Sequence, residues 1–114
     1  MSVAALIVAA GRGSRLKGNI AKQYLALDNN TILRETVKNF TEHPQVDYVT
    51  VVINRKDLNL YKKSIKNLKV TNPVEGGKTR QDSVRLGLNS LKKIFPKKVL
   101  IHDAARPFIE KKYI

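Results

Sequence analysis

The sequence predicts an α/β fold in which a mostly parallel sheet is connected by helical crossovers. Residues 3–10 form a run without any polar side chain, which is typical of a strand buried on both faces. Strand-like and helix-like patterns then alternate, and small or polar residues follow the strand ends. With 114 residues, 42% of them hydrophobic, the chain is expected to form at most one domain, residues 1–114, with a modest core.

Three amphipathic helices are predicted from apolar residues that recur every three or four positions. The first begins behind Asn30 or Thr31 as a cap and ends near Pro44. The third begins at Thr79, which is expected to form a capping box with Asp82. The apolar positions of the three helices are Ile32, Leu33, Val37 and Phe40, then Leu58, Tyr61, Ile65 and Leu68, then Val84, Leu88, Leu91 and Phe95.

Three further strands are predicted between and after these helices. Residues 46–53 are rich in β-branched and aromatic side chains, residues 69–74 offer a shorter strand, and residues 98–102 form the last one. The resulting order of strand and helix favours crossovers that connect parallel strands. In such sheets, ligands bind beyond the carboxyl ends of the strands, so the residues just after each strand are the candidates for function.

The first of these loops has the composition of an anion-binding site. Gly11 and Gly13 follow the first strand, and the absent Cβ atoms allow positive φ and a close approach of backbone N–H groups to a phosphate. Arg15 and Lys22 add positive charge, so a phosphorylated nucleotide is the expected ligand. An ordinary turn with solvated basic residues explains the same loop when it is considered alone.

Two common phosphate-binding signatures do not match this loop. Leu16 occupies the place of the third glycine in the dinucleotide fingerprint. Asn19 follows Gly18 where the nucleotide triphosphatase loop requires lysine.

The loops after the later strands carry further candidates. Gly76 and Gly77 could bring backbone amides or carbonyls to the edge of a base, and Ser83 offers a hydroxyl at the same mouth. Asp103 is a lone carboxylate at a strand end, which suits a Mg²⁺ ion that keeps its waters and shares phosphate oxygens. A solvent-facing aspartate that caps the next turn is the alternative. The two histidines are expected to be structural, with His43 on the surface and His102 packed or orienting Asp103.

Charge and composition exclude several other classes. The formal net charge is +13, but the lysines are spread over several elements and do not alternate with aromatic residues, which disfavours nucleic-acid binding. The chain has no cysteine, so disulfides and thiolate metal sites are excluded. No basic residue precedes the first apolar run, and no segment reaches membrane-spanning length, so a soluble cytoplasmic protein is expected.

Four motifs in order resemble one family. They are Ala-Ala-Gly-x-Gly-x-Arg at 9–15, Lys-Gln-Tyr-Leu at 22–25, Gly-Gly-x-x-Arg-x-x-Ser at 76–83 and His-Asp-Ala-Ala-Arg-Pro at 102–107. Together they resemble the 2-C-methyl-D-erythritol 4-phosphate cytidylyltransferases of the non-mevalonate isoprenoid pathway. The resemblance implies a Rossmann-like nucleotidyltransferase fold, apparently truncated, because it covers only about the N-terminal half of a family member.

The resemblance also implies an activity and a role for each matching residue. CMP would be transferred from CTP to methylerythritol phosphate, with pyrophosphate released and a divalent cation, Mg²⁺, as cofactor. The incoming phosphomonoester is already ionised, so positive charge is needed rather than a general base. The implied roles are transition-state stabilisation by Arg15 and Lys22, CTP contacts by Ala9, Ala10, Gly11, Gly77, Lys78 (through its backbone) and Ser83, Mg²⁺ binding by Asp103, and contact with the methylerythritol phosphate by Arg106.

Departures from the family pattern are small. Ala21 replaces the usual proline before Lys22, and Lys78 stands where an acidic or polar residue is common. Full-length family members are expected to be homodimers, and in some bacteria the same domain is fused to a downstream cyclase. Two alternatives stay open: a cytidylyltransferase for another polyol phosphate, such as ribitol 5-phosphate, and a non-catalytic fragment that binds CTP.

Overall fold

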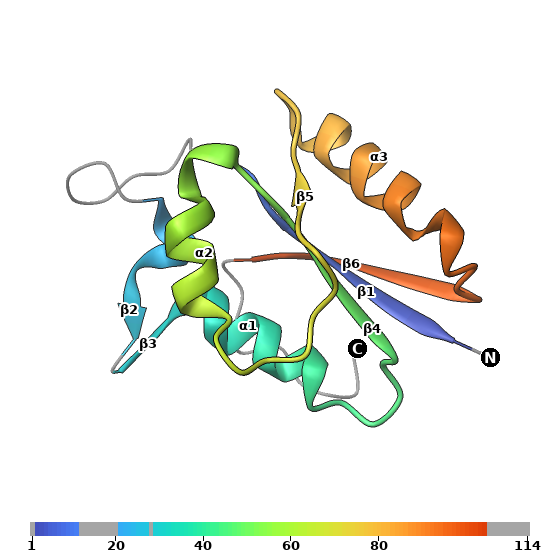
Figure 1. Ribbon diagram of the computed structural model, residues 1–114, viewed down its shortest axis with the longest axis horizontal. Coiled ribbons are helices and arrows are strands. Elements are labelled where there is room, and N and C mark those ends of the chain that lie inside the picture. Colours follow the sequence, from blue (N-terminus) through green and yellow to red (C-terminus); the bar gives the residue numbers. More distant parts are fainter. Residues whose placement is uncertain (1, 12–20, 28, 105–114) are drawn as a thin grey trace.

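The computed structural model describes residues 2–11, 21–27 and 29–104, and a parallel sheet forms its centre (Figure 1). The sheet has four strands in the order β5-β4-β1-β6, and every pairing in it is parallel. The strands are β1 (Val3–Ala9), β4 (Tyr48–Ile53), β5 (Val74–Glu75) and β6 (Lys98–Asp103). The chain runs outward from β1 to β5 and then crosses back to place β6 on the other side of β1, which confirms the predicted α/β fold.

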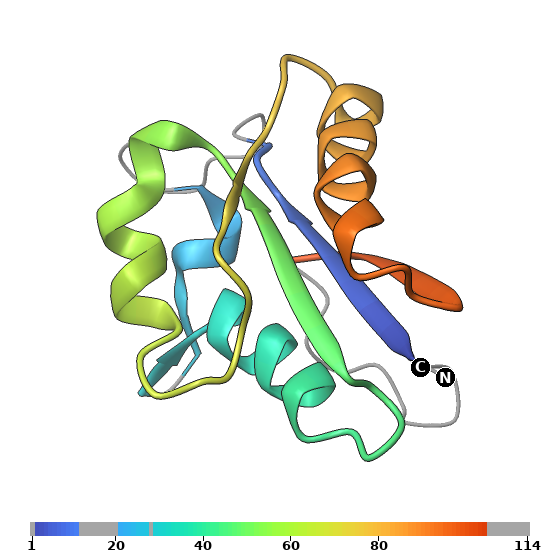
Figure 2. The same cartoon turned by 45° about the vertical axis from the view of Figure 1, so that its right-hand side comes forward.

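Helices cover both faces of this sheet (Figures 1 and 2). α1 (Ile32–Thr41) and α2 (Leu58–Ser64) lie on one face, and α3 (Arg80–Ser90) lies on the other. None of the helices in the described ranges combines the length and apolar character needed to cross a bilayer. Smaller elements, not predicted from the sequence, are the 3-10 helices η1 (Lys22–Tyr24), η2 (Arg55–Asp57) and η3 (Leu91–Lys93) and the antiparallel pair β2 (Ala26–Leu27) and β3 (Asn30–Thr31).

β1 is buried on both faces, as its apolar run predicts. Six of its seven residues are buried. Successive side chains of a strand point to opposite faces. Ala5 and Ile7 therefore belong to the cluster under α1 and α2, whereas Ala4 and Leu6 belong to the cluster under α3. The first strand thus supplies the centre of both cores.

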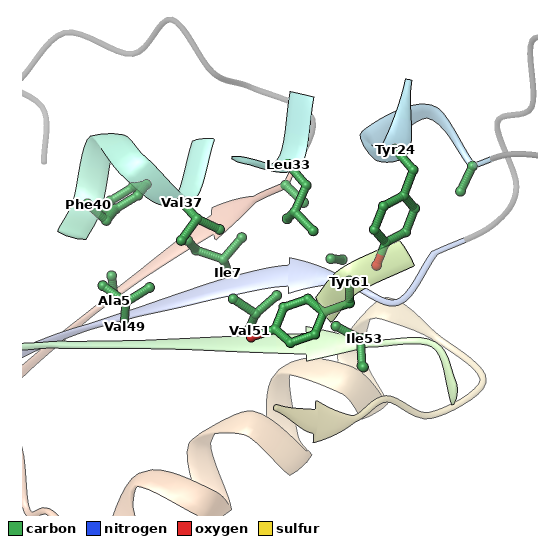
Figure 3. Close-up of a cluster of buried hydrophobic side chains, with 13 residues drawn as sticks. Ala5, Ile7, Tyr24, Leu33, Val37, Phe40, Val49, Val51, Ile53 and Tyr61 are labelled. Carbon is green, nitrogen blue, oxygen red and sulfur yellow. The ribbon is translucent and has the colours of Figure 1, made fainter. Parts of the chain in front are cut away.

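α1 also matches its prediction closely. The Thr31 side chain caps its first turn by accepting a hydrogen bond from the Arg34 amide at 3.1 Å. Leu33, Val37 and Phe40 are buried along one stripe and pack over β1 and β4 (Figure 3). The helix therefore forms where a local cap and a helical apolar period agree.

The strand expected at residues 69–74 is much shorter than predicted. Only Val74 and Glu75 pair regularly with β4. Before them, Thr71 makes one backbone bond to β4, from its amide to the Val49 carbonyl at 2.9 Å. Pro73 has no N–H to donate to a ladder, which explains why regular pairing begins only after it.

The stripe predicted for the third helix also ends early. α3 and η3 carry the chain only to Lys93, and Phe95 is 85% exposed with a φ of 51°. Pro96 follows it, and a residue before proline is disfavoured in helical conformation. Leu91, by contrast, is buried as predicted.

Tyr61 places a hydroxyl without a hydrogen-bond partner in the described core, and its cost in stability can be measured. Tyr61 is 1% exposed and lies among the buried residues of the core (Figure 3). Within the described part of the chain, its hydroxyl has no hydrogen-bond partner. A buried polar group without a partner costs free energy, so Tyr61→Phe is expected to raise the free energy of unfolding by about 1 kcal/mol. Chemical denaturation at neutral pH measures this, and a destabilised variant would contradict it.

The same side chain gives a pH dependence of known sign. Burial raises the pKa of Tyr61 from 10.0 to about 12. The unfolded chain releases this proton near pH 10, while the folded chain holds it until about pH 12, so stability falls across that interval. The difference in unfolding free energy between Tyr61→Phe and the parent chain is therefore expected to increase above pH 10.

Candidate functional site

The carboxyl ends of the parallel strands meet at one edge of the sheet, where the predicted residues were expected. Val8 of β1 is in register with Asp103 of β6, and the Ala104 amide donates to the Val8 carbonyl at 3.0 Å. On its other side, the end of β1 pairs with Ile53 of β4, which in turn pairs with Glu75. The predicted residues that the structure brings to this edge are Ala9, Ala10, Gly11, Gly77, Lys78, Ser83 and Asp103. It is the position at which α/β sheets bind ligands.

The loop after β5 packs directly on the end of β1 at Gly76. A Cβ atom at Gly76 would lie 2.4 Å from the Ala10 Cβ and 2.6 Å from the Ser83 Oγ. The Gly76 amide also donates to the Ile53 carbonyl at 2.8 Å. Only a residue without a side chain fits this close approach, so glycine here fixes the position of the loop relative to β1.

Ser83 lies deeper than the sequence suggested. Its side chain is 2% exposed, and its Oγ accepts a hydrogen bond from the Gly77 amide at 3.1 Å. Because the N–H groups of Gly76 and Gly77 both donate within the fold, their carbonyl groups are the better candidates for contact with a base. Ser83 therefore holds the Gly76-Gly77 loop through this hydrogen bond. Lys78, the next residue of the loop, is exposed.

The start of α3 is joined to the end of β6 by an ion pair. Thr79 caps the helix through its side chain, which accepts from the Asp82 amide at 3.0 Å, so the predicted cap is confirmed. The next residue, Arg80, donates from Nε to Asp103 Oδ1 at 3.1 Å. Both side chains are partly exposed, so the pair adds little stability, but it places Arg80 beside Asp103 at the candidate edge. Sequence reasoning gave Arg80 no role, although it lies in the Gly-Gly-x-x-Arg-x-x-Ser motif.

Two side-chain amides hold the backbone just after β1. Gln23 Nε2 donates to the carbonyls of Ala9 at 2.8 Å and Gly11 at 3.2 Å. Asn54 Nδ2 donates to the carbonyl between them, that of Ala10, at 3.4 Å. Three successive carbonyl groups are thus engaged from within the protein. Gly11 has no positive φ, and a Cβ there would meet no described atom within 4 Å, so neither backbone strain nor crowding by the described residues calls for glycine here.

Lys22 is presented by a short and well-anchored helix. It opens η1 and is exposed, whereas its neighbours Ala21, Gln23 and Tyr24 are all buried. The Tyr24 amide donates to the Ala21 carbonyl at 2.9 Å, which closes the turn around Lys22. The backbone position of Lys22 is therefore set by core packing. The other predicted cations, Arg15 and Arg106, lie outside the described residues, as does Gly13.

The histidines have structural surroundings. His102 packs against Phe40 with ring centroids 5.2 Å apart, as a packing residue would. His43 was expected on the surface but is only 8% exposed, because its Nδ1 accepts a hydrogen bond from the Gln45 amide at 3.1 Å and so fixes the turn after α1.

Within the described ranges, no three acidic or histidine side chains gather as a metal site made only of protein ligands would require.

A single carboxylate nevertheless fits the way in which proteins hold Mg²⁺. Mg²⁺ keeps several waters and takes one or two carboxylates together with substrate phosphates. Asp103 is half-buried at the strand edge and already faces the cationic group of Arg80. Its oxygens are of the kind that Mg²⁺ takes, but Arg80 already bonds Oδ1, so a cation that arrives with a nucleotide would share this carboxylate with Arg80 or displace it.

Comparisons with known proteins identify the same family that the motifs resemble. The family model described as "IspD: 2-C-methyl-D-erythritol 4-phosphate cytidylyltransferase" matches residues 3–114. The "Bifunctional enzyme IspD/IspF" of Paramagnetospirillum magneticum is 51% identical over 105 residues, which are 92% of this chain and 27% of that protein. The "2-C-methyl-D-erythritol 4-phosphate cytidylyltransferase" of Clostridium novyi is 44% identical over 115 residues, covering 96% of this chain and 48% of that protein.

Solved structures agree with this result. The crystal structure of Francisella tularensis 2-C-methyl-D-erythritol 4-phosphate cytidylyltransferase (IspD) superposes with a TM-score of 0.74 at 33% sequence identity, covering 96% of this chain and 47% of that one. The chain therefore spans about half the length of such relatives and about a quarter of the bifunctional ones.

Proposed function

Because the chain belongs to the 2-C-methyl-D-erythritol 4-phosphate cytidylyltransferase family, we propose that the protein containing it transfers CMP from CTP to 2-C-methyl-D-erythritol 4-phosphate and releases pyrophosphate. The reaction would serve the synthesis of isoprenoid precursors by the non-mevalonate pathway. The relatives named for this activity, and the order of the motifs in this chain, support the proposal.

One structural observation carries the proposal furthest. Lys22 is exposed and directly precedes Gln23, and the carbonyl groups of residues 9–11 are all held by the side-chain amides of Gln23 and Asn54. A triphosphate is recognised by backbone N–H groups and fixed positive charge, and this segment follows a buried strand where such ligands bind. On the other side, the Gly76-Gly77 loop is packed against Ala10, close enough to complete the same site.

The chemistry assigned to these residues is electrostatic. The phosphomonoester oxygen attacks the α-phosphorus in line, and pyrophosphate departs. Lys22, together with Arg15, would neutralise charge that builds on the α-phosphate and the leaving group. Asp103 would hold Mg²⁺, which supplies further neutralisation of phosphate charge when bound. Arg106 would bind the acceptor phosphate, while Ser83 and Gly77 would shape the base pocket.

Pyrophosphate release tests the proposal directly. The complete protein is incubated with CTP and Mg²⁺ and, in parallel, with methylerythritol phosphate, ribitol 5-phosphate or no acceptor. Release that depends on methylerythritol phosphate is the expected result. A preference for ribitol 5-phosphate would overturn the acceptor, and a CTP-induced rise in melting temperature without any pyrophosphate would overturn catalysis. Sedimentation of the same sample tests the homodimer that the resemblance implies.

A further inference from the structure

Gln23 is a buried polar side chain that contacts the candidate site without facing an expected ligand. It is 7% exposed, and its amide nitrogen donates to two carbonyl groups that lie two residues apart, Ala9 at 2.8 Å and Gly11 at 3.2 Å. An amide nitrogen carries two hydrogens, so both donors are used on one short segment. This contact joins η1 to the end of β1 across a separation of 12 to 14 residues.

These bonds fix more than the two oxygen atoms. In a trans peptide, the C=O group and the following N–H group point in opposite directions, so a held carbonyl also sets the direction of the next N–H. Gln23 holds the carbonyl groups of Ala9 and Gly11, and Asn54 holds that of Ala10 at the longer distance of 3.4 Å, so the directions of the Ala10 and Gly11 N–H groups are set. Carbonyl oxygens that could turn toward a phosphate would repel it, and the side-chain amides prevent this.

Gln23 also anchors the backbone of the neighbouring Lys22. Lys22 precedes it in η1, and the side chains on either side of Lys22, Ala21 and Gln23, are 0% and 7% exposed. A shift of the Gln23 amide would therefore move the backbone of Lys22 together with residues 9–11.

We propose that Gln23 is a positioning residue that holds the backbone of Lys22 and residues 9–11 as one rigid unit. The inference rests on the proposed function, because it concerns the distance between Lys22 and the nucleotide phosphates. Its effect is expected in the chemical step, since a displacement of about 1 Å of a reacting group can reduce a rate about a hundredfold.

A double-mutant cycle in the complete protein tests the proposal. Gln23→Leu removes both donors at similar volume, and Gln23→Glu replaces them with an acceptor. Each is expected to reduce the turnover number for pyrophosphate release by about ten- to a hundredfold. In the Lys22→Ala background, Gln23→Leu is expected to cause a smaller further loss, because the lysine that it positions is gone and only its hold on residues 9–11 is still removed. Equal losses in both backgrounds would overturn the proposal, as would an unchanged turnover number in the Lys22 protein.

A matched control separates positioning from general damage. Gln45 is exposed and precedes β4 at the opposite end of the sheet, so Gln45→Leu is expected to leave turnover unchanged. Thermal unfolding of all variants reports folding, and a loss of turnover that merely follows the melting temperature would count against positioning. If the parent protein releases no pyrophosphate with any acceptor, the proposed function fails. If the parent is active and Gln23→Leu is equally active, only the positioning role fails.

Discussion

Lys22→Ala is expected to reduce the turnover number for pyrophosphate release by about a hundredfold or more, with little change in the melting temperature. The loss follows from the removal of a preorganised cation from the charge that develops in the transition state. Folding should be spared because the Lys22 side chain is exposed, while the residues that anchor η1, Ala21 and Tyr24, remain. Steady-state kinetics with CTP and methylerythritol phosphate, beside thermal unfolding, measures both effects.

A lysine elsewhere on the surface provides the control for this variant. Lys63 is exposed on α2 and is not among the predicted site residues, so Lys63→Ala changes net charge equally and should leave turnover intact. Arg15→Ala is expected to behave like Lys22→Ala, although Arg15 lies outside the described residues. Near-normal turnover of the Lys22 variant would refute its assignment to the chemistry.

Gly76→Ala is expected to destabilise the fold by about 1–3 kcal/mol and to abolish nucleotide binding, because the added methyl group has no room. It would lie 2.4 Å from the Ala10 Cβ and 2.6 Å from the Ser83 Oγ, and the Ala10 backbone cannot withdraw as a flexible side chain could. The loop must then move away from β1 and separate the two sides of the candidate site. Chemical denaturation measures the stability, and titration calorimetry with CTP measures the binding.

Gly11→Ala is the matched comparison for Gly76→Ala. A Cβ at Gly11 meets no described atom within 4 Å, so this variant should keep its stability. Its methyl group would instead occupy space next to the backbone proposed to receive the triphosphate. We therefore expect weaker CTP binding at nearly unchanged stability. Equal destabilisation by the two substitutions would show that crowding does not distinguish these glycines.

The elements that the sequence predicted well are those in which local and tertiary preferences agree. β1 is an apolar run that any buried parallel strand would require, and α1 has both its cap at Thr31 and an apolar stripe of helical period. The cap of α3 at Thr79 is equally local, since its bond spans three residues. Candidate site residues followed from the rule that ligands gather at strand ends, together with the family motifs.

Sequence-distant contacts decided what could not be predicted. Residues 69–74 have strand propensity, but Pro73 and the course of the chain beside β4 limit β5 to two residues. The role of Gln23 depends on carbonyls 12 to 14 residues away, and that of Arg80 on a carboxylate 23 residues away. No local pattern encodes such partners. The sequence alone thus determined the α/β class, the caps and the identity of the candidate loops, whereas packing across the sheet determined which groups are held, buried or exposed, because those contacts form only when distant segments meet.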